Sequence, residues 1–276
     1  MRPMDDMLRS ASGRVSFHMP GHMGRAPFGE GQALYALDTT ELPTTDDFYG
    51  ASAGIAQAQA LYAAFAGAGA TLFLHNSTTA GIHAMLEMYA GEGDTVLLPR
   101  NAHLSATAAC VLGGIEPVWM PVTVTPDGYA YVPEDTVLAA LETHPEAKTV
   151  LLTRPDYYGG AVPMARIVKK ARAMGIRVLA DEAHGAQWPC MAAPLSAGVC
   201  GADAWVQSAH KTLPAFTGSA VLNLRDAADR PAAMRVLRRE QTSSPSFLLL
   251  RSVDDARAWM TEHGACALRR LTERLA

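Results

Sequence analysis

The feature that most constrains this chain is a set of short strands that are apolar almost throughout. Examples are residues 149–153, 176–180 and 220–224. A strand with one face in water alternates apolar and polar side chains, whereas a strand buried on both faces does not. We therefore expect a mainly parallel sheet with helices on both faces.

Helical patterns alternate with these strands along the chain. The predicted strands are 71–75, 95–98, 117–120, 149–153, 176–180, 204–206 and 220–224. The predicted helices are 55–66, about 80–89, 102–112, 133–143 (opened by Pro133), 163–174, 226–239 and 254–276. This alternation indicates the α/β class.

The pattern of predicted helices and strands divides the chain into three segments. Residues 1–50 contain no long periodic segment, and we expect them to form an irregular arm packed on a second subunit. Residues 51–225 carry the strand–helix alternation of a large domain. Residues 226–276 form a helical C-terminal segment.

The composition excludes several classes of protein. The 276 residues are 49% hydrophobic and 18% charged, so we expect a sizeable core. The net charge of −4 gives no reason to expect nucleic acid or a membrane as partner. Residues 1–16 do not resemble a signal peptide, and no apolar run approaches ~20 residues. Four cysteines without a CxxC pair are predicted to be buried free thiols, and the protein to be cytoplasmic.

Four polar stretches lie at predicted carboxyl ends of strands, where open parallel sheets bind ligands. They are Asn76-Ser77-Thr78, Arg100-Asn101-Ala102-His103, Asp181-Glu182-Ala183-His184 and Ser208-Ala209-His210-Lys211. Each has an ordinary alternative: a helix N-cap, a loop histidine, a capping aspartate, and a lysine just past a strand end that is held by a carboxylate. Together they describe a pocket for pyridoxal phosphate (PLP), with a phosphate cup, a ring-stacking histidine, a carboxylate for the ring nitrogen and a reactive amine.

Lys211 is singled out among the four lysines because it follows the apolar run 204–206. An apolar setting favours the neutral form of an amine, and a neutral amine can attack an aldehyde. We therefore expect a desolvated lysine here.

Other nucleotide and hydrolase motifs are missing. Asp181-Glu182-Ala183-His184 matches a helicase box, but no lysine follows a glycine as a phosphate loop requires. GxSxG and GxGxxG are also absent. His18 and His22 have a metal-like spacing, but Pro20 and Gly21 separate them, so we expect no metal site.

With these motifs in order, the chain resembles the fold-type-I, PLP-dependent ornithine/lysine/arginine decarboxylases. The resemblance covers nearly the whole chain. It is carried by His18-Met-Pro-Gly-His22, Asn76-Ser-Thr-Thr-Ala-Gly81, Pro99-Arg-Asn-Ala-His103, Asp181-Glu-Ala-His-Gly185, Ser208-Ala-His-Lys211 and Ser243-Ser-Pro-Ser246. It implies the aspartate aminotransferase fold for the large domain and PLP as cofactor.

The resemblance also implies a role for each matching residue. Lys211 would form the internal aldimine, and Lys211 or His210 would return the proton after carbon dioxide leaves. Asp181 would pair with the pyridine nitrogen. The remaining positions would be His103 stacked on the ring, Ala183 packed under it, His184 near its phenolic oxygen, and Ser77, Thr78, Ser208 and His210 on the phosphate.

By the same resemblance, the protein would decarboxylate ornithine, lysine or arginine, in polyamine metabolism, as a homodimer or higher homo-oligomer with sites at the interface. A basic substrate needs an acidic contact for its distal amine. Asp38, Glu41, Asp46 and Asp47 are the candidates, with helix capping or surface charge as the alternative for each.

The sequence departs from the family pattern in several places. Family members continue past Ser246 into a smaller C-terminal domain, whereas ~30 residues follow here, so we expect a truncated member or a separate polypeptide that supplies the rest. Met23 replaces a usual lysine, Asp46-Asp47-Phe48-Tyr49 differs from Asp-Asp-Leu-His, and Arg154-Pro155-Asp156 stands where Asn-Pro-Thr is usual. Two alternatives stay open: a catalytically reduced binding or regulatory partner, and aminotransferase or aldolase chemistry on the same fold.

Overall fold

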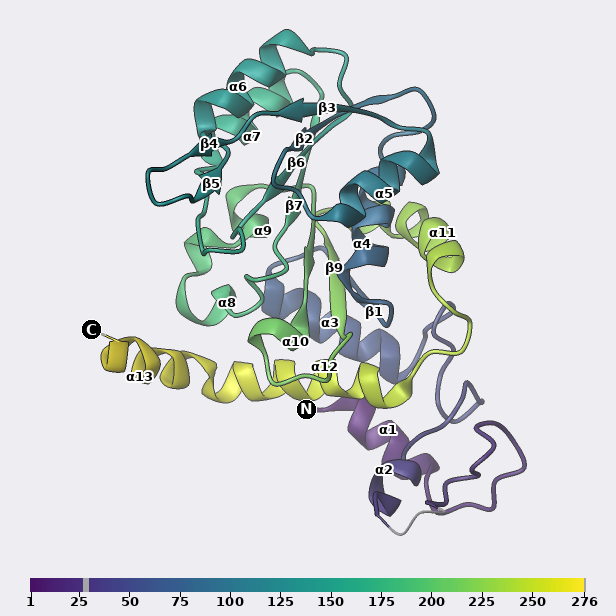
Figure 1. Ribbon diagram of the computed structural model, residues 1–276. Coiled ribbons are helices and arrows are strands. Elements are labelled where there is room, and N and C mark those ends of the chain that lie inside the picture. The colour runs from purple at the N-terminus through teal and green to yellow at the C-terminus, as the bar shows by residue number, and fades with distance from the viewer. Residues whose placement is uncertain (27–29, 276) are drawn as a thin grey trace.

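The computed structural model describes residues 1–26 and 30–275 and is organised around one seven-stranded sheet (Figure 1). The strand order is β1-β9-β8-β7-β6-β2-β3. The strands are β1 (Ala70–Leu74), β2 (Thr95–Pro99), β3 (Glu116–Met120), β6 (Thr149–Thr153), β7 (Arg177–Asp181), β8 (Ala204–Gln207) and β9 (Ala220–Leu224). All seven predicted strands are confirmed, with small shifts at their ends.

The sheet is mainly parallel, as predicted. The β2–β3, β2–β6, β6–β7 and β7–β8 pairs are parallel, whereas β9 runs antiparallel to both β1 and β8. Two antiparallel steps restore the direction, so β1 points the same way as β8. The carboxyl ends of β1, β2, β6, β7 and β8 therefore share one edge of the sheet.

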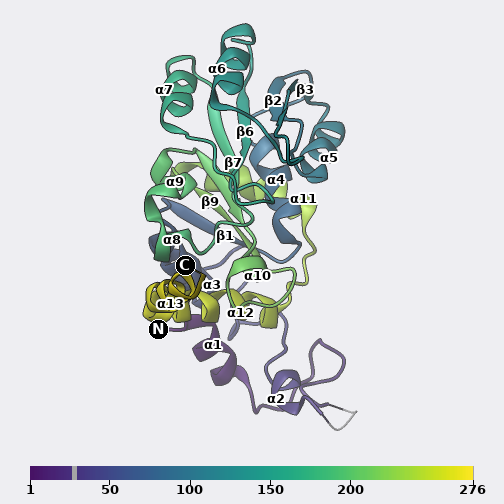
Figure 2. The same cartoon turned by 60° about the vertical axis from the view of Figure 1, so that its left-hand side comes forward.

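Helices cover both faces of the sheet (Figure 2). Alternate residues of the apolar strands enter different clusters: Leu97 and Val150 join one, and Val96 and Leu151 the other. The first cluster includes α3 (Gly54–Ala66), α6 (Glu134–Thr143), α7 (Ala165–Ala173) and α12 (Phe247–Trp259). The second includes α4 (Ser77–Glu87), α5 (Leu104–Gly113) and α11 (Arg230–Glu240). Burial on both sides explains why these strands lack polar alternation.

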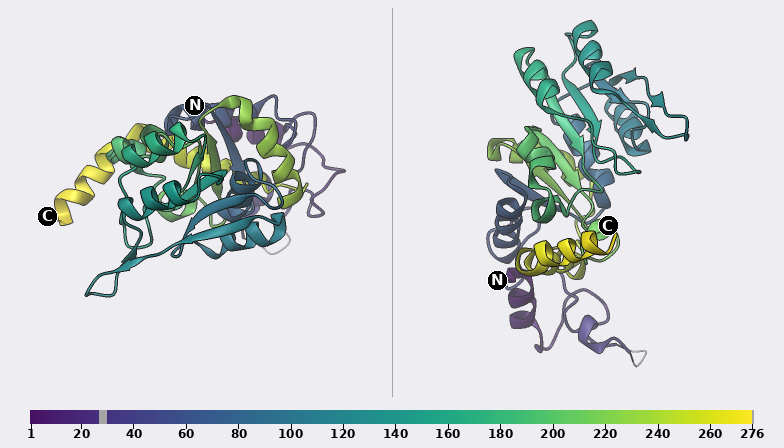
Figure 3. Two further views of the ribbon diagram at one scale, coloured as in Figure 1. Left: turned by 90° about the horizontal axis from the view of Figure 1, so that it is seen from above. Right: turned by 90° about the vertical axis from the view of Figure 1, so that its left-hand side faces the viewer.

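The last long helix begins earlier than predicted. We expected it to start at Asp254, but α12 starts at Phe247, where the Ser246 hydroxyl caps it by accepting a hydrogen bond from Leu249 N at 3.3 Å. A short π-helix, Met260–Gly264, joins α12 to α13 (Ala265–Leu275). Figure 3 shows α13 reaching away from the sheet.

The expectation of an irregular arm is wrong for its first residues. Helix α1 (Pro3–Ala11) packs against α3 and α12, and its Met4 and Leu8 side chains are buried in the main core. Arg251 of α12 pairs with Asp5 at 2.7 Å. A second short helix, α2 (Gln32–Tyr35), follows in the arm. The domain boundaries at residues 50 and 225 stay predictions.

Several short elements were not predicted. They are a hairpin of β4 (Thr123–Val124) and β5 (Ala130–Tyr131), and the helices α8 (Trp188–Met191), α9 (Ala197–Cys200) and α10 (Ala209–Thr212). Pro133 is the N-cap of α6 and not its first helical residue. The cysteines are unpaired as predicted, but of the four Cys110 alone is buried, and Cys266 is exposed. Among the described residues, no helix has the length and apolar character needed to cross a bilayer.

Candidate active site

The predicted site residues meet at the shared carboxyl edge of the sheet. Asp181 ends β7, Ser208 follows β8, and Thr78 lies in the first turn of α4 after β1. Helix α4 approaches the sheet closely at Gly81, where an added Cβ would lie 2.6 Å from Val206 Cγ1 and 2.7 Å from Leu74 Cδ1. A glycine is therefore required to bring the start of α4 against β8.

Two buried hydroxyls lie close together at the position predicted for the phosphate cup. Thr78 Oγ1 and Ser208 Oγ lie 3.3 Å apart, although 130 residues separate them in the sequence. Ser77 has a φ of +64°, and its N–H donates to Gly218 O at 3.1 Å. This left-handed residue turns the chain from β1 into α4, whose N-terminal dipole favours an anion. His210 Nδ1 contacts Ser219 O at 2.8 Å, which fixes the orientation of its ring.

Asp181 is a buried carboxylate with few hydrogen bonds. Its Oδ1 accepts from Ala183 N at 3.2 Å. Burial raises the pKa of Asp181, and the Ala183 N–H and the charges of Lys211 and His103 only partly oppose this rise. A cation placed at this carboxylate would be bound strongly, because its charge would offset the cost of burial.

Lys211 and His184 form a direct contact. Lys211 Nζ lies 3.2 Å from His184 Nε2. Burial, and then the charge of Lys211, lowers the pKa of His184, so the neutral imidazole can accept a hydrogen bond from the ammonium group. The expectation of a desolvated lysine is wrong for the isolated chain, because Lys211 is exposed. Lys211 lies in the short helix α10, at the edge of the sheet where the parallel strands end. The apolar run 204–206, which suggested a desolvated lysine, is buried in β8 and does not cover Lys211.

His103 has a structural task in addition to its predicted one. Its Nδ1 accepts from Ser105 N at 3.2 Å and so caps the start of α5. The ring is exposed at the site edge, and its charge is close enough to Asp181 to oppose the rise in the pKa of that carboxyl group.

Two neighbouring residues were not identified as site residues from the sequence. Glu182 is fully buried beneath the site, where it accepts from Ala197 N and Gln207 Nε2, each at 2.6 Å. Burial raises the pKa of Glu182 to about 8. Tyr157 lies edge-to-face on His184, with 5.9 Å between ring centroids. Glu182 could have been identified from its position inside the Asp181–His184 motif, whereas no sequence feature marks Tyr157 as a site residue.

The acidic candidates of the arm have local structural partners. Asp46 accepts hydrogen bonds from the N–H groups of Ser52, Ala53 and Ile55, each at 3.0 Å, and so caps α3. Asp38 contacts His22 at 3.2 Å. Glu41 accepts from Phe48 N at 2.7 Å, and Asp47 from Tyr49 N at 2.7 Å. The capping alternative therefore holds for Asp46 alone, whereas Asp38, Glu41 and Asp47 contact a histidine or loop N–H groups.

One cluster has the composition of a metal site. Ligand atoms of His83, Glu87 and Glu240 lie within 4.8 Å of one another. Arg239 forms ion pairs with both glutamates, and His83 Nδ1 contacts Glu240 at 2.8 Å. The cluster is a charge network that joins α4 to α11, and the expectation of no metal site stays a prediction.

Comparison with known proteins identifies the family. The family model for Orn/Lys/Arg decarboxylase, major domain, matches residues 3–275. An uncharacterised protein of Bacillus subtilis, YaaO, is 40% identical over 255 residues, which cover 89% of this chain and 53% of that protein. An arginine decarboxylase of Bacillus cereus is 33% identical over 264 residues, 92% of this chain and 57% of that protein. The chain thus spans about half the length of these relatives.

Solved structures share the fold. The constitutive lysine decarboxylase of E. coli superposes with a TM-score of 0.84 at 20% identity, over 99% of this chain and 43% of that one. Lysine decarboxylase A of Pseudomonas aeruginosa gives 0.77 at 20% identity, over 96% and 40%. The expected fold class is confirmed. The match over residues 3–275 shows that the chain belongs to the Orn/Lys/Arg decarboxylase family.

Proposed function

We propose that this chain carries the catalytic centre of a PLP-dependent decarboxylase of ornithine, lysine or arginine. The main support is the meeting of Asp181, Lys211 and the Thr78–Ser208 hydroxyl pair at one sheet edge, in a chain of this family. They come from the ends of three strands, β1, β7 and β8, and together they are the amine, anion site and carboxylate that PLP needs.

The residues present fit PLP. Asp181 is buried with a raised pKa and one backbone N–H donor, so a protonated ring nitrogen would supply the charge that it lacks. The Thr78 and Ser208 hydroxyls can turn from each other toward phosphate oxygens, next to the positive end of α4. Lys211 Nζ would hold the cofactor aldehyde, with His103 over the ring and Ala183 under it. When bound, PLP supplies an electron sink for the pair of electrons left at Cα as carbon dioxide leaves.

The chain's own groups have three tasks in this reaction. Asp181 and the ring nitrogen would stabilise each other as an ion pair, so that the carboxylate stays ionised and the nitrogen stays protonated. His184, neutral and 3.2 Å from Lys211 Nζ, can hold a proton of that amine and orient it. Lys211, or His210, the residue before it in α10, would return a proton to Cα.

An assembled form is part of the proposal. Because Lys211 and His103 are exposed on this chain, a homodimer or higher homo-oligomer would supply the missing wall, with residues 1–50 as part of the contact. A separate C-terminal-domain partner could have the same effect. A cytoplasmic location and a role in polyamine metabolism belong to the same proposal.

The exposed Lys211 also supports a second candidate function, a binding or regulatory partner with a reduced site. Aminotransferase or aldolase chemistry stays open as well, because the fold is shared with an L-threonine transaldolase of Pseudomonas fluorescens (TM-score 0.67, 18% identity) and does not select the bond that breaks.

The test is a visible spectrum of the protein with PLP, compared with Lys211→Ala, followed by borohydride reduction and peptide mapping. We expect a long-wavelength band in the unmodified protein, its loss in Lys211→Ala, and cofactor fixed to Lys211 after reduction. Lys170→Ala, which removes a surface lysine paired with Glu142, is the matched control and should leave the band unchanged. Identical spectra for Lys211→Ala and the unmodified protein would overturn the proposal and favour the binding partner. Carbon dioxide release from ornithine, lysine and arginine then identifies the substrate.

A further inference from the structure

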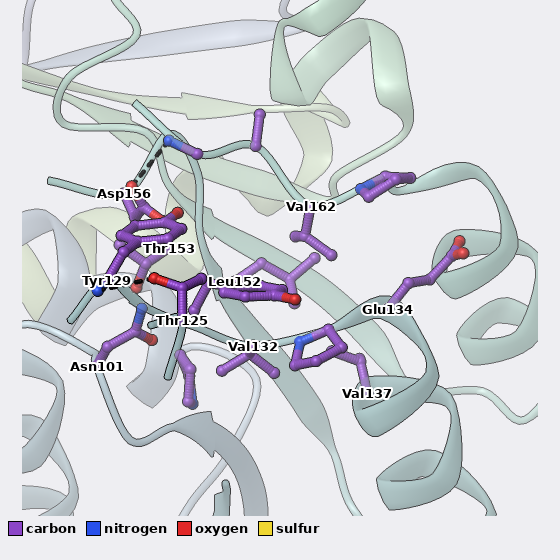
Figure 4. Close-up of a pocket in the computed structure, with 16 residues that line it drawn as sticks. Asn101, Thr125, Tyr129, Val132, Glu134, Val137, Leu152, Thr153, Asp156 and Val162 are labelled. Atoms are coloured by element: carbon purple, nitrogen blue, oxygen red, sulfur yellow. Dashed lines mark hydrogen bonds between the residues drawn. The ribbon is translucent and has the colours of Figure 1, made fainter. Parts of the chain in front are cut away.

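A cavity of about 310 Å³ lies beside the candidate site and has no task in the proposed reaction (Figure 4). The ends of β2 and β6, the β4–β5 hairpin and the start of α6 enclose it. Its lining includes Asn101, two residues before His103, and Thr153, the parallel-strand partner of Asp181. The cavity therefore borders the same edge of the sheet as Lys211.

Polar side chains gather at one end of the cavity around Asp156, apolar side chains line its middle, and Glu134 lies at the far end (Figure 4). The polar groups are joined by contacts: Tyr129 Oη donates to Asp156, Tyr129 N donates to Thr125 Oγ1 at 3.1 Å, and Asn101 Nδ2 donates to Ala130 O at 3.4 Å. The apolar wall is formed by Val132, Val137, Leu152 and Val162. Such a shape suits a small molecule with one polar head on a hydrocarbon body.

Asp156 gives the polar end a negative charge that is not neutralised. The residue is 6% exposed, and its donors are Tyr129 Oη, Tyr158 N at 3.0 Å and Gly160 N at 2.8 Å. All three donors are neutral, and in the part of the chain that the structure describes no cationic side chain forms an ion pair with Asp156. A buried charge is costly unless a counter-charge accompanies it, so this position favours a cation.

Two further polar atoms at this end have no partner among the described residues. Asn101 Oδ1 and Thr153 Oγ1 are buried without a hydrogen bond. Buried polar atoms are normally satisfied, and an unsatisfied pair beside a cavity indicates a ligand that can donate hydrogen bonds. An ammonium group has three N–H donors, enough for Asp156, Asn101 and Thr153.

The rest of the lining is also suited to a cation. The described lining residues include no lysine, arginine or histidine, and the second carboxylate, Glu134, is neutralised by Arg166 at 2.9 Å. Tyr129 and Tyr131 stack with centroids 5.5 Å apart at 10°, and aromatic faces attract cations. Burial, with the hydrogen bond to Asp156, raises the pKa of Tyr129 to about 12, so the phenol stays a donor.

We propose that this cavity binds a protonated aliphatic amine, with its ammonium group at Asp156 and its carbon chain against Val132, Val137 and Val162. Binding itself does not depend on the proposed reaction. Its significance does rest on the proposed function, since decarboxylation of a basic amino acid releases an amine with a second cationic group, and one of these groups would bind at Asp156. Tyr157, the neighbour of Asp156, packs on His184, which contacts Lys211, so an occupant would be linked to the reactive amine through two side chains.

The test is calorimetric titration of the full chain, with and without PLP, using 1-aminopentane, 1,5-diaminopentane, 1-pentanol and pentanoate. These probes share a five-carbon body and differ in their head groups. We expect both amines to bind at least ~10-fold more tightly than the alcohol and the carboxylate, as expected for a charged hydrogen bond. Comparable binding of pentanoate and 1-aminopentane, or no amine binding, would refute the site, and this comparison needs no variant.

Variants then locate the site. Asp156→Asn should weaken amine binding at least ~10-fold, and Ala161→Leu, which keeps the carboxylate but narrows the cavity, should weaken it as well. Lys211→Ala, the control, should lose the PLP label and keep amine binding, which separates this proposal from the proposed function. Amine binding that follows Lys211 and ignores Asp156 and Ala161 would place the ligand in the candidate active site and overturn the proposal.

Discussion

Two buried aspartates in this molecule have opposite electrostatic environments. Asp46, in the arm, accepts from the backbone N–H groups of Asp47, Ser52, Ala53 and Ile55. Burial raises its pKa, but these four donors outweigh burial, and the net effect is a lowered pKa. Asp181, at the sheet edge, has one such donor, and its pKa is raised by burial. The number of N–H donors thus distinguishes a carboxylate that is satisfied by its own chain from one that requires a cation from outside.

The sharpest test of this difference is Asp181→Asn. PLP retention should fall by at least ~100-fold, because the amide cannot neutralise a protonated ring nitrogen. The cofactor-free chain should become more stable at neutral pH by about 1 kcal/mol, because a buried charge has been removed. Cofactor titration and urea unfolding measure the two effects. A variant that loses cofactor and stability together would show that Asp181 is mainly structural.

The pH dependence of the same carboxylate has a defined sign. Because its folded-state pKa is raised, the folded state binds a proton more readily than the unfolded state, so stability falls as pH rises from the unfolded value through the folded one. Bound PLP should reduce this fall in stability with rising pH, because its protonated ring nitrogen would stabilise the ionised carboxylate.

Asp46→Asn should have the opposite effect on stability. It keeps a residue type that tolerates the φ of +69° at this position, yet it weakens four hydrogen bonds from backbone N–H groups, three of them at the start of α3. We expect a loss of about 2 kcal/mol in the free energy of unfolding, with PLP retention unchanged. Because the folded-state pKa of Asp46 is lowered, its contribution is lost as pH falls through that value. An unchanged unfolding midpoint at pH 7 would contradict the capping role.

Glu182→Gln tests how the buried charge of Glu182 affects the stability of the protein at different pH values. The pKa of Glu182 rises from 4.5 to about 8, so its charge should reduce stability progressively as pH increases across that range. Between pH 5 and pH 9, urea unfolding should show that the variant loses less stability than the unmodified protein, by about 4 kcal/mol for the full shift. Glu142→Gln, at an exposed ion pair with Lys170, is the control and should leave the slope unchanged. Equal slopes in Glu182→Gln and the unmodified protein would rule out a buried charge there.

Much of the central fold could be predicted, because burial on both sides gives β6, β7 and β9 a strong local pattern. The start of α12 is not predicted, because Phe247–Leu250 is apolar at every position and so has no helical period. Helix α1 had signals, with Pro3 at its start and Asp5 and Asp6 in its first turn, but only tertiary packing shows that Met4 and Leu8 enter the core.

The site was predictable as a set of residues and not as a geometry. Motif order identified Asp181 and Lys211, and the sheet direction put them on one edge. The remaining contacts depend on the path of the loops, which no local sequence pattern encodes. These contacts are Lys211 with His184, the His103 cap of α5, and Tyr129 with Asp156. The roles of the site residues stay predictions until the cofactor experiments are made.

The antiparallel strand β9 has a consequence for how the protein forms during synthesis. It pairs Ala70 with Leu224 and Leu74 with Ala220, so β1 has no neighbour in the main sheet until the ribosome has made nearly the whole domain. Pairings between residues so distant in the chain form slowly. The Thr78 side of the predicted phosphate cup can therefore form only after β9, one of the last strands, is made. A nascent chain that ends before residue 220 would expose β1 as an unpaired, aggregation-prone edge.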